Sequence, residues 1–390
     1  MIILDKPYVS DYLLKTILSE KLPVLRNSFT ESLPELAAHL IVDSEFVERI
    51  KTGSTMRFYS TTENAIGWIA EHLAFLDLPQ QIDVFKDKVK FRELIQSIYP
   101  DFIYQKVTID ELDELDISSF PFPFIIKPSV GFFSMGVYRV DSMSDWKRKK
   151  VKLLKEIQDA GSIYPKEVFN GTSFIIEELI EGDEYAFDAY FDEFGNPVVL
   201  NAYKHFFADE DDVSDRVYFT SKQILAEKIP VFTDFLQKMG KLISVKNFPI
   251  HVEVRISEDQ QLIPIEANPF RFGGWCTTAD MTQHALGFNP YHYYLKSIKP
   301  DWNEIFSKMN DSFYSIVVLN NSTGVDGKNI ESFDYESLNQ HFTRILELRK
   351  VDFKAYPVFG FLFTETPSDS FAELENIAKS SLKEFIKNLI

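Results

Sequence analysis

Residues 123–140 read "PFIIKPSVGFFSMGVYRV", two apolar runs joined by a loop of small residues. The first run ends at Lys127, and Gly131 and Gly136 stand within the loop that follows. Glycine lacks Cβ, so backbone amides of such a loop can approach a ligand, and consecutive amides form a concave site for an anion. A lysine at the end of the preceding strand can direct its ammonium group at the same anion. The pattern favours a polyphosphate site, and the plain structural alternative is a hairpin with a solvated lysine.

A hairpin of alternating charged and apolar residues follows at 250–269, "IHVEVRISEDQQLIPIEANP". Because side chains alternate between the two faces of a strand, Glu253 lies on the polar face of the first strand. Pro264, Glu266 and Asn268 share one face of the return strand. The hairpin can therefore bring together two carboxylates and an amide oxygen, which are hard oxygen ligands suited to Mg²⁺. The alternatives are a solvated charged face and a pair of glycosidase acids.

Between these stretches lies "SFIIEELIEGDEYAFD", residues 173–188. The apolar residues 174–176 predict a buried strand, and Gly182 predicts a bend. A nucleotide base needs a flat apolar slot with backbone hydrogen bonds at its edge, which a strand that runs into a connector can supply. Glu184 can accept hydrogen bonds from two ribose hydroxyls. An acidic turn of this kind is also typical of a solvated surface.

The composition limits the classes of function. The 390 residues carry 41 basic and 59 acidic side chains, a formal net charge of −18. This argues against nucleic acid as the main partner, because phosphate backbones require a basic face. The single cysteine, Cys276, can form no internal disulfide and no cysteine-based metal site, and fits a reducing compartment. Without a signal sequence or a membrane-spanning apolar stretch, a cytoplasmic protein with no membrane partner is expected.

The N-terminal part, residues 1–85, alternates short strands and helices, which is typical of a small parallel sheet. Ser10 is expected to cap the first helix. Ser60 and Glu63 have the spacing of a capping box ahead of a further helix.

The rest of the chain has longer strands and hairpins. Residues 83–98 form an amphipathic pattern in which Lys88 and Arg92 stand one turn apart. Gly and Asn within residues 193–196 predict the turn of a hairpin. The last residues, 370–389, are expected to close the chain as a helix.

In this order the motifs resemble the ATP-grasp superfamily. The likeness rests on Lys127-Pro128 with its loop, on "EELIEGDE" at 177–184, and on "HVEVR" with "IPIEANPFRFGG". "DKVKFREL", residues 87–94, is also similar to that family's D-K-x-x-x-R-x-x-L helix. The resemblance covers about residues 60–290 and implies an ATP-grasp fold of mixed α+β and α/β class. The implied parts are a parallel-sheet pre-ATP-grasp domain at 1–85, the ATP-grasp domain at 86–300 with a lid at about 120–182, and a small α+β region at 301–390.

The resemblance also implies a role for each matching residue. Two lysines and the pliable loop would hold the phosphates of ATP. A connector would read adenine, largely through its backbone, and an acid would bind the ribose. Two acids and an amide would hold Mg²⁺, with Mn²⁺ as the alternative ion. The phosphate-binding residues would be Lys88, Lys127, Ser134, Met135 and Gly136. The adenine connector would be Glu177, Glu178, Leu179 and Ile180, and the ribose acid would be Glu184. The metal ligands would be Glu253, Glu266 and Asn268.

Three basic residues are the candidates for catalysis. Arg271 matches the family arginine that steadies an acyl-phosphate, but it stands three residues after the asparagine where the commoner family form has two. Lys204 and Arg216 lie in the segment 203–221 and are candidates, with His205, to reach the reacting carboxylate or the γ-phosphate. The alternative for this segment is a solvated acidic loop.

The activity implied by the resemblance is an ATP- and Mg²⁺-dependent ligase that joins a carboxylate to an amine. The expected partners are these small molecules, and a homodimer is left open. Three alternatives stand beside it: an ATP-dependent carboxylase, a small-molecule kinase, and a nucleotide-binding protein without catalysis. The full set of lysines and metal ligands argues against the last of these.

Overall fold

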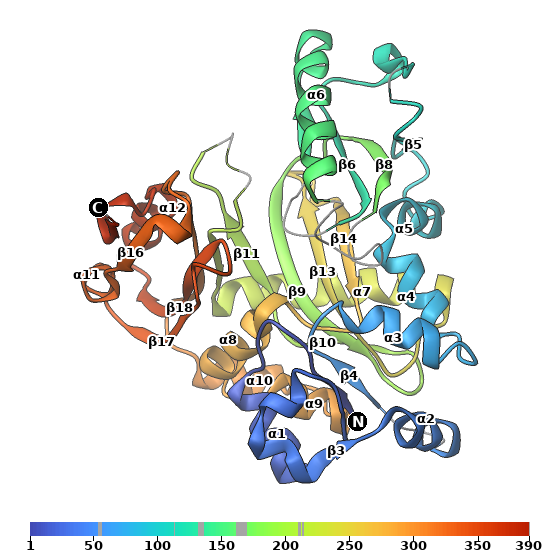
Figure 1. The fold of residues 1–390 in the computed structure, drawn as a ribbon, viewed down its shortest axis with the longest axis vertical. Coiled ribbons are helices and arrows are strands. Elements are labelled where there is room, and N and C mark those ends of the chain that lie inside the picture. The colour runs from blue at the N-terminus through green and yellow to red at the C-terminus, as the bar shows by residue number, and fades with distance from the viewer. Residues whose placement is uncertain are drawn as a thin grey trace.

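The computed structural model describes residues 1–53, 57–112, 114–131, 136–160, 170–209, 212 and 214–389. Within them the strands form four sheets (Figure 1). In the part of the chain that is described, no helix combines the length and apolar character that crossing a membrane requires. The cytoplasmic location and the homodimer stay predictions.

The N-terminal sheet is parallel, as predicted. Its strands are two residues long and are buried, and helices connect them. The strands, in sheet order, are β3 (Leu40–Ile41), β2 (Val24–Leu25), β1 (Ile2–Ile3) and β4 (Tyr59–Ser60), and the helices are α1 (Asp11–Glu20), α2 (Asp43–Thr52) and α3 (Ala65–His72).

One of the two predicted helix caps is confirmed. Ser10 Oγ accepts hydrogen bonds from the backbone of the first turn of α1. The capping box is wrong, because α3 begins at Ala65 with no side-chain cap, and Ser60 Oγ donates to the carbonyl oxygen of Thr62. Glu63 turns into the protein instead, where it meets two cations. A carboxylate gains more from charged donors than from one backbone amide.

The predicted amphipathic helix is interrupted at Asp87. Residues on either side form α4 (Leu78–Lys86) and α5 (Lys88–Ile95). The side chain of Asp87 accepts from the amides of Val89 and Lys90 and so caps α5. This cap fixes the start of α5, and Lys88 and Arg92 lie one turn apart on it, both buried.

The second sheet is antiparallel, and three of its four strands lie in the segment predicted as a lid, while β5 (Tyr104–Thr108) precedes it. Helix α6 (Met143–Ala160) packs on it (Figure 1), and its apolar core includes Phe124, Trp146 and Phe174. In order, the strands are β5 (Tyr104–Thr108), β8 (Asn170–Glu178), β6 (Phe124–Val130) and β7 (Tyr138–Val140).

The largest sheet has nine strands and carries both predicted hairpins. Helix α7 (Lys222–Ile243) supplies much of the core beneath it. The turn predicted at 193–196 is present, but the return strand breaks after β10 (Pro197–Val199). In sheet order, the other strands are β14 (Leu262–Pro269), β13 (Phe248–Ile256), β9 (Asp183–Phe191), β11 (Tyr203–Phe206), β12 (Val217–Thr220), β15 (Ser312–Asn320), β18 (Val358–Pro367) and β17 (Ile345–Lys350).

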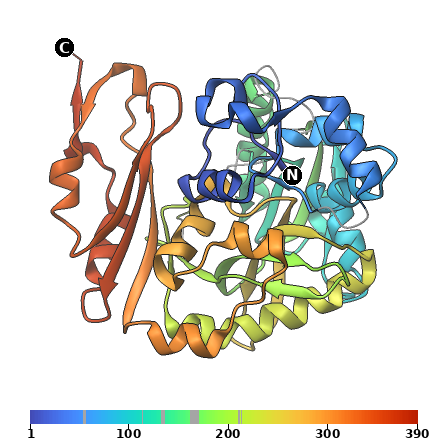
Figure 2. The same cartoon turned by 90° about the horizontal axis from the view of Figure 1, so that it is seen from below.

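The C-terminal segment extends this sheet with three strands and forms a separate two-stranded sheet with two others. β15 pairs with β12, and β18 and β17 follow outward; Figure 2 shows the segment beside the N-terminal part. The predicted terminal helix is wrong beyond Lys379, because the chain leaves it to pair β19 with β16. The remaining elements are α8 (Thr277–Leu286), α9 (Pro290–Lys296), α10 (Trp302–Lys308), β16 (Ile330–Phe333), α11 (Tyr335–Asn339), α12 (Ala372–Lys379) and β19 (Ile386–Asn388). The predicted fold class is confirmed, and the three-part division of the chain stays a prediction.

Candidate active site

The hairpin of β13 and β14 carries the predicted metal ligands. Glu253 pairs directly with Glu266 in the strand register, and Asn268 follows two residues later. Directly paired residues lie side by side on one face, and Asn268 Nδ2 donates to Glu266 Oε1 over 3.0 Å. The prediction that Pro264 shares this face is wrong. A register shift beside Glu253 places it opposite Val254, because a bulge inserts one residue and reverses the faces beyond it.

The two carboxylates differ in their electrostatic environment. Burial disfavours the charged form of Glu266, but Lys88, whose Nζ lies 2.7 Å from Glu266 Oε2, and the amide of Asn268 hold its pKa well below the usual range. Burial and the charge of Glu266 raise the pKa of Glu253. A divalent cation between two such carboxylates would offset their repulsion. Two carboxylates and an amide oxygen are a donor set that fits Mg²⁺.

The donor set is incomplete without a ligand. Among the residues that the structure describes, no group of three or more His, Cys, Asp or Glu side chains is arranged to hold a metal. Mg²⁺ commonly takes one or two carboxylates and completes its shell with waters and substrate phosphates. The hairpin fits a Mg²⁺ site of this open kind, which waters and phosphates complete, and not a site whose ligands all come from the protein.

Lys127 on β6 is joined to α5 through Glu177 of β8. Lys127 Nζ lies 2.5 Å from Glu177 Oε1, and Arg92 Nε donates to Glu177 Oε2 over 2.9 Å. Burial raises the pKa of Glu177, but the two cations outweigh it and lower the pKa. Arg92 Nη1 also donates to the carbonyl oxygen of Pro264 over 2.6 Å. Arg92 therefore connects the lid sheet to the hairpin, and Lys127 lies near enough to Lys88 for their charges to interact.

The predicted adenine connector has its two carboxylates engaged elsewhere. Glu177 is held in the ion pairs above, and Glu178 Oε1 accepts from the amide of Ile103 over 3.1 Å. Leu179 is half-buried and Ile180 is buried. A base at this connector would therefore meet backbone groups and apolar side chains, and the adenine role stays a proposal.

Glu184, the predicted ribose acid, is almost buried beside a histidine and an arginine. His205 Nδ1 lies 3.1 Å from Glu184 Oε1, and Arg255 Nε donates to Glu184 Oε2 over 3.1 Å. Burial raises the pKa of Glu184, but these partners lower it overall. Arg255 Nη1 also donates to the carbonyl oxygen of Ile180 over 2.9 Å, so one side chain links the connector to the ribose acid.

The predicted phosphate loop is described only at its two ends. Ser134 and Met135 lie outside the described residues. Gly136 has φ +70°, and a Cβ there would lie 3.1 Å from a proline side chain, so the position requires glycine. The carbonyl oxygen of Gly131, at the other end, accepts from Lys86 Nζ over 3.1 Å.

Arg271 forms an ion pair that the sequence did not predict. Arg271 Nη2 donates to Glu63 Oε1 over 3.0 Å, and Lys86 Nζ pairs with Glu63 Oε2. Burial raises the pKa of Glu63, but Lys86 and Arg271 lower it overall. The charges of Glu266 and Glu253 also act on Arg271, which places the guanidinium near the predicted metal ligands. The only sequence signal for Glu63 was its spacing from Ser60, and that pattern predicted a different role.

Comparison with known proteins identifies the domain to which much of this region belongs. Residues 120–279 match the model of the ATP-grasp domain. The chain contains an ATP-grasp domain. No curated protein matches the sequence. The predicted family is thus confirmed.

Several solved structures resemble this chain over nearly its whole length. The L-amino acid ligase from Bacillus licheniformis superposes with a TM-score of 0.70 at 16% identity, over 100% of this chain and 98% of that one. N5-carboxyaminoimidazole ribonucleotide synthetase from Thermotoga maritima superposes with a TM-score of 0.62 at 13% identity, over 99% of this chain and 98% of that one. Biotin carboxylase from Campylobacter jejuni superposes with a TM-score of 0.60 at 13% identity, over 94% of this chain and 87% of that one. At these identities the similarity shows the fold alone.

The structure turns Lys204 away from the face that carries Glu184 and gives Arg216 a partner in the C-terminal segment. Lys204 pairs with Tyr185 in the register of β11 and β9, one position away from the ribose acid, so strand alternation directs it to the opposite face. Its ammonium lies 2.7 Å from Asp183. Arg216 Nη2 donates to Ser322 Oγ over 2.8 Å, within the C-terminal segment. Burial lowers the pKa of Arg216 to about 10.

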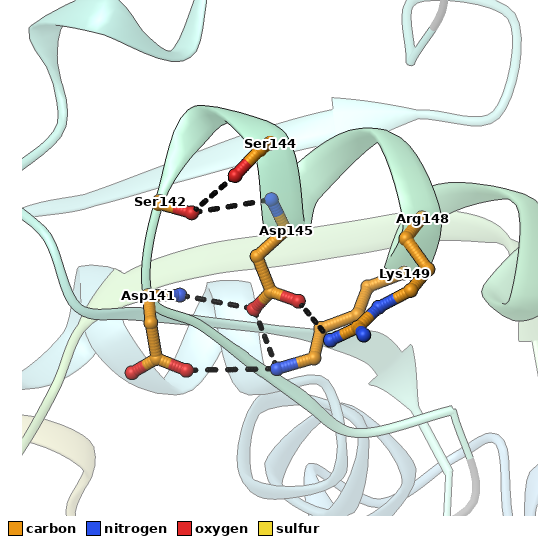
Figure 3. A pocket seen from close by; sticks show the side chains of 6 residues that line it. All are labelled: Asp141, Ser142, Ser144, Asp145, Arg148 and Lys149. Carbon is orange, nitrogen blue, oxygen red and sulfur yellow. Dashed lines mark hydrogen bonds and ion pairs between the residues drawn. The ribbon is translucent and has the colours of Figure 1, made fainter.

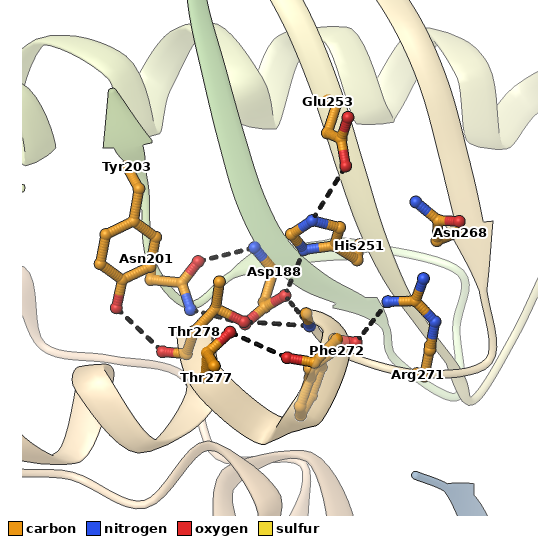
Figure 4. A network of polar contacts seen from close by, with 12 residues as sticks. Asp188, Asn201, Tyr203, His251, Glu253, Asn268, Arg271, Phe272, Thr277 and Thr278 are labelled. Carbon is orange, nitrogen blue, oxygen red and sulfur yellow. Dashed lines mark hydrogen bonds and ion pairs between the residues drawn. The ribbon is translucent and has the colours of Figure 1, made fainter. Parts of the chain in front are cut away.

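A buried polar network lies beneath the candidate site (Figure 4), and of its members the sequence indicated only His251, as a histidine that either helps the site or is hydrogen-bonded within its strand. Asp188 Oδ1 accepts from His251 Nδ1 over 2.8 Å and from the amide of Gly273 over 2.9 Å, and Oδ2 accepts from Asn201 Nδ2 over 2.8 Å. His251 Nε2 lies 3.6 Å from Glu253 Oε1. Burial lowers the pKa of His251, but both carboxylates raise it, to about 9. Asp188 therefore connects the strand of the metal ligands to the loop after Arg271.

A pocket at the start of α6 has a different character (Figure 3). Asp145 lies 2.6 Å from Lys149 Nζ and 2.7 Å from Arg148 Nη2. Its charged side chains thus pair with one another, and we assign it no role. The lining residues are Asp141, Ser142, Ser144, Asp145, Arg148 and Lys149.

Replacing Glu63 tests the ion pair with Arg271. Glu63→Gln keeps the shape of the side chain but removes the charge that holds Arg271 and Lys86. We expect kcat/KM for ATP-dependent turnover to fall by roughly 10- to 100-fold, since small displacements of a positioning group cost this much. Glu71→Gln, an exposed glutamate of the neighbouring α3, is the matched control. Equal loss in both variants, or none in either, would contradict the assignment.

Proposed function

We propose that the chain is an ATP- and Mg²⁺-dependent ligase that activates a carboxylate as an acyl-phosphate and joins it to an amine. Both substrates would be small molecules. The proposal names the reaction class, and the two substrates are to be found by experiment.

The observation that supports the proposal most is the position of helix α5. Lys88, on its first turn, pairs with Glu266 of the metal hairpin. Arg92, one turn later, pairs with the Glu177 that holds Lys127 of the lid. Two amines, one from helix α5 and one from strand β6, are thereby directed to the neighbourhood of two carboxylates. A polyphosphate with a divalent cation is the ligand whose charges complement both groups.

The reaction follows from these charges. A substrate carboxylate oxygen attacks the γ-phosphorus of ATP, the bond to the β-phosphate oxygen breaks, and ADP leaves. The amine nitrogen then attacks the acyl carbon, phosphate leaves, and the amine loses a proton. Lys88 and Lys127 neutralise charge on the transferred group, so catalysis is largely positioning and electrostatics. Arg271 steadies the acyl-phosphate.

Glu253, Glu266 and Asn268 would hold Mg²⁺, which when bound supplies further charge neutralisation on the phosphates. The chain's own residues orient the reactants around it. Water has to be excluded, because it would hydrolyse the acyl-phosphate. The element we propose for this closure is the loop 129–136, of which residues 129–131 and 136 are described.

Three other classes remain alternatives. An ATP-dependent carboxylase would use bicarbonate as the acid, and a small-molecule kinase would stop after phosphoryl transfer. A nucleotide-binding protein without catalysis would bind ATP without turnover. The three buried pairs around the lysines and Arg271 favour catalysis, since simple retention of a nucleotide does not call for an arginine beside the metal ligands.

The test is a screen for ADP release. The chain is incubated with ATP and Mg²⁺ and with pairs drawn from the amino acids and small carboxylates, and then with bicarbonate. Release that requires both a carboxylate and an amine, with an amide product by mass spectrometry, supports the ligase. Release with bicarbonate alone supports the carboxylase, and a stable phosphorylated product supports the kinase. Either of those outcomes, or no release at all, refutes the proposal.

A further inference from the structure

The loop that follows Arg271 has an unusual backbone. Trp275 (φ 54°, ψ 23°) and Cys276 (φ 61°, ψ 16°) both have left-handed conformations. Such conformations are uncommon for residues with a Cβ and persist only where the surroundings enforce them. Two in succession therefore require partners that hold the loop in place.

Arg349, on strand β17 of the C-terminal segment, is one such partner. Its Nη1 donates to the carbonyl oxygen of Trp275 over 2.7 Å, and its Nη2 donates to Asp280 Oδ2 over 2.6 Å and to Glu347 Oε1 over 2.9 Å. The guanidinium also lies over the ring of Tyr8, 4.1 Å from its centroid. The side chain is about 5% exposed. A single buried guanidinium thus contacts the loop, helix α8, the N-terminal domain and its own strand.

Two partners of Arg349, Asp280 and Trp275, are themselves held in place by other residues. Asp280, on the first turn of α8, accepts from Ser10 Oγ over 2.5 Å, and Ser10 caps α1. The ring of Trp275 packs against Tyr356 and Phe361, with centroids 5.1 and 5.3 Å away. Both the backbone and the side chain of Trp275 are therefore held by the C-terminal segment.

The held loop is continuous with the proposed site. Arg271 Nη1 donates to the carbonyl oxygen of Phe272 over 2.9 Å, and the amide of Gly273 donates to Asp188 over 2.9 Å. Three residues separate Arg271 from Trp275. A change at Trp275 therefore reaches Arg271 through a short and otherwise anchored stretch of backbone.

We propose that Arg349 is a positioning residue, through which the C-terminal segment fixes the loop 271–276 and with it the site of the substrate carboxylate. The second half of this statement rests on the proposed ligase function. A guanidinium suits the task because its planar fork can donate to the loop and to Asp280 at once. Lysine keeps the charge but lacks this geometry.

The contacts of Arg349 with the loop 271–276 and with Asp280, which we call the clamp, can be tested without any substrate. Cys276 is the single cysteine of the chain and is buried, and burial raises its pKa to about 12, so its thiol should react slowly with a disulfide reagent such as DTNB. In Arg349→Lys we expect the labelling rate to rise at least tenfold. Arg344→Lys, an exposed arginine beside the same strand, should label at the wild-type rate. Asp280→Asn removes the charge at the other end of the clamp and should also label faster.

The kinetic arm uses the pair of compounds that gives the most ADP release with the wild-type chain. In Arg349→Lys we expect KM for the carboxylate to rise roughly tenfold, while KM for ATP changes less than twofold. Wild-type labelling rates in both Arg349→Lys and Asp280→Asn would overturn the proposal, as would faster labelling with unchanged KM for the carboxylate. If no compound raises ADP release even in the wild type, the ligase function fails, and the labelling rates still decide whether Arg349 holds the loop.

Discussion

Glu266→Gln is expected to abolish ATP turnover while the protein stays folded. The carboxylate of Glu266 serves two groups, since it pairs with Lys88 and faces Glu253 in the hairpin register. The amide loses the charge that both Lys88 and a divalent cation require. We expect kcat/KM to fall roughly a thousandfold, comparable to the removal of a central electrostatic group from an active site. Steady-state ADP release measures the effect.

A structural defect and a site defect are separated by binding and by a control. Mn²⁺ binding in the presence of ADP, followed by electron paramagnetic resonance, should weaken at least tenfold in Glu266→Gln. Glu258→Gln, in the exposed turn of the same hairpin, should retain both binding and turnover. Full activity in Glu266→Gln would refute the metal assignment and the ligase proposal with it.

The largest expected effect on stability comes from Glu177→Gln. Glu177 is the shared partner of Lys127 and Arg92, and all three side chains are at most 5% exposed. Removing it leaves two buried cations without their counter-ion. Breaking a buried ion pair in this way typically costs about 3–5 kcal/mol of the free energy of unfolding. Urea denaturation measures the change, and Glu178→Gln, whose side chain accepts one backbone hydrogen bond, should cost about 1 kcal/mol.

The effect of Glu177→Gln on the free energy of unfolding is expected to depend on pH. The pKa of Glu177 in the folded protein lies below its ordinary value of 4.5. Its contribution to stability is therefore complete above about pH 4.5 and is lost as the pH falls through the lower, folded pKa. The difference in free energy of unfolding between wild type and Glu177→Gln should shrink with acid in that range. A difference that stayed constant down to pH 3 would show that the charge of Glu177 is not what stabilises the lid.

Much of the fold and of the candidate site could be predicted because it depends on local patterns. Alternation within each strand of 250–269 places Glu253 on the polar face of the first strand and puts Glu266 and Asn268 on one face of the second, since the period of a strand is two. Asp87, Lys88 and Arg92 carry a cap and one helical turn within six residues. Gly136 adopts a positive φ that its residue type permits. The family resemblance joined these local signals into one fold, which the comparisons confirm.

The contacts between distant segments could not be predicted in this way. Glu63 has the spacing of a capping box, yet two cations from α4 and from the loop after β14 compete for it successfully. The bulge beside Glu253 that turns Pro264 over depends on how β13 and β14 pair. Lys204 was a candidate by composition, and only the register of β11 against β9 decided which face it occupies.

The sequence by itself determined the two strands of the hairpin and the helical turn of Lys88 and Arg92, because each depends on residues a few positions apart. The tertiary structure alone decided which charges meet. Asp188 with Gly273, Glu63 with Arg271, and Arg349 with Trp275 are 74 to 208 residues apart. Such a pair forms only when the packing of whole sheets and helices encloses both members, and a buried charge then takes the nearest partner that the fold provides.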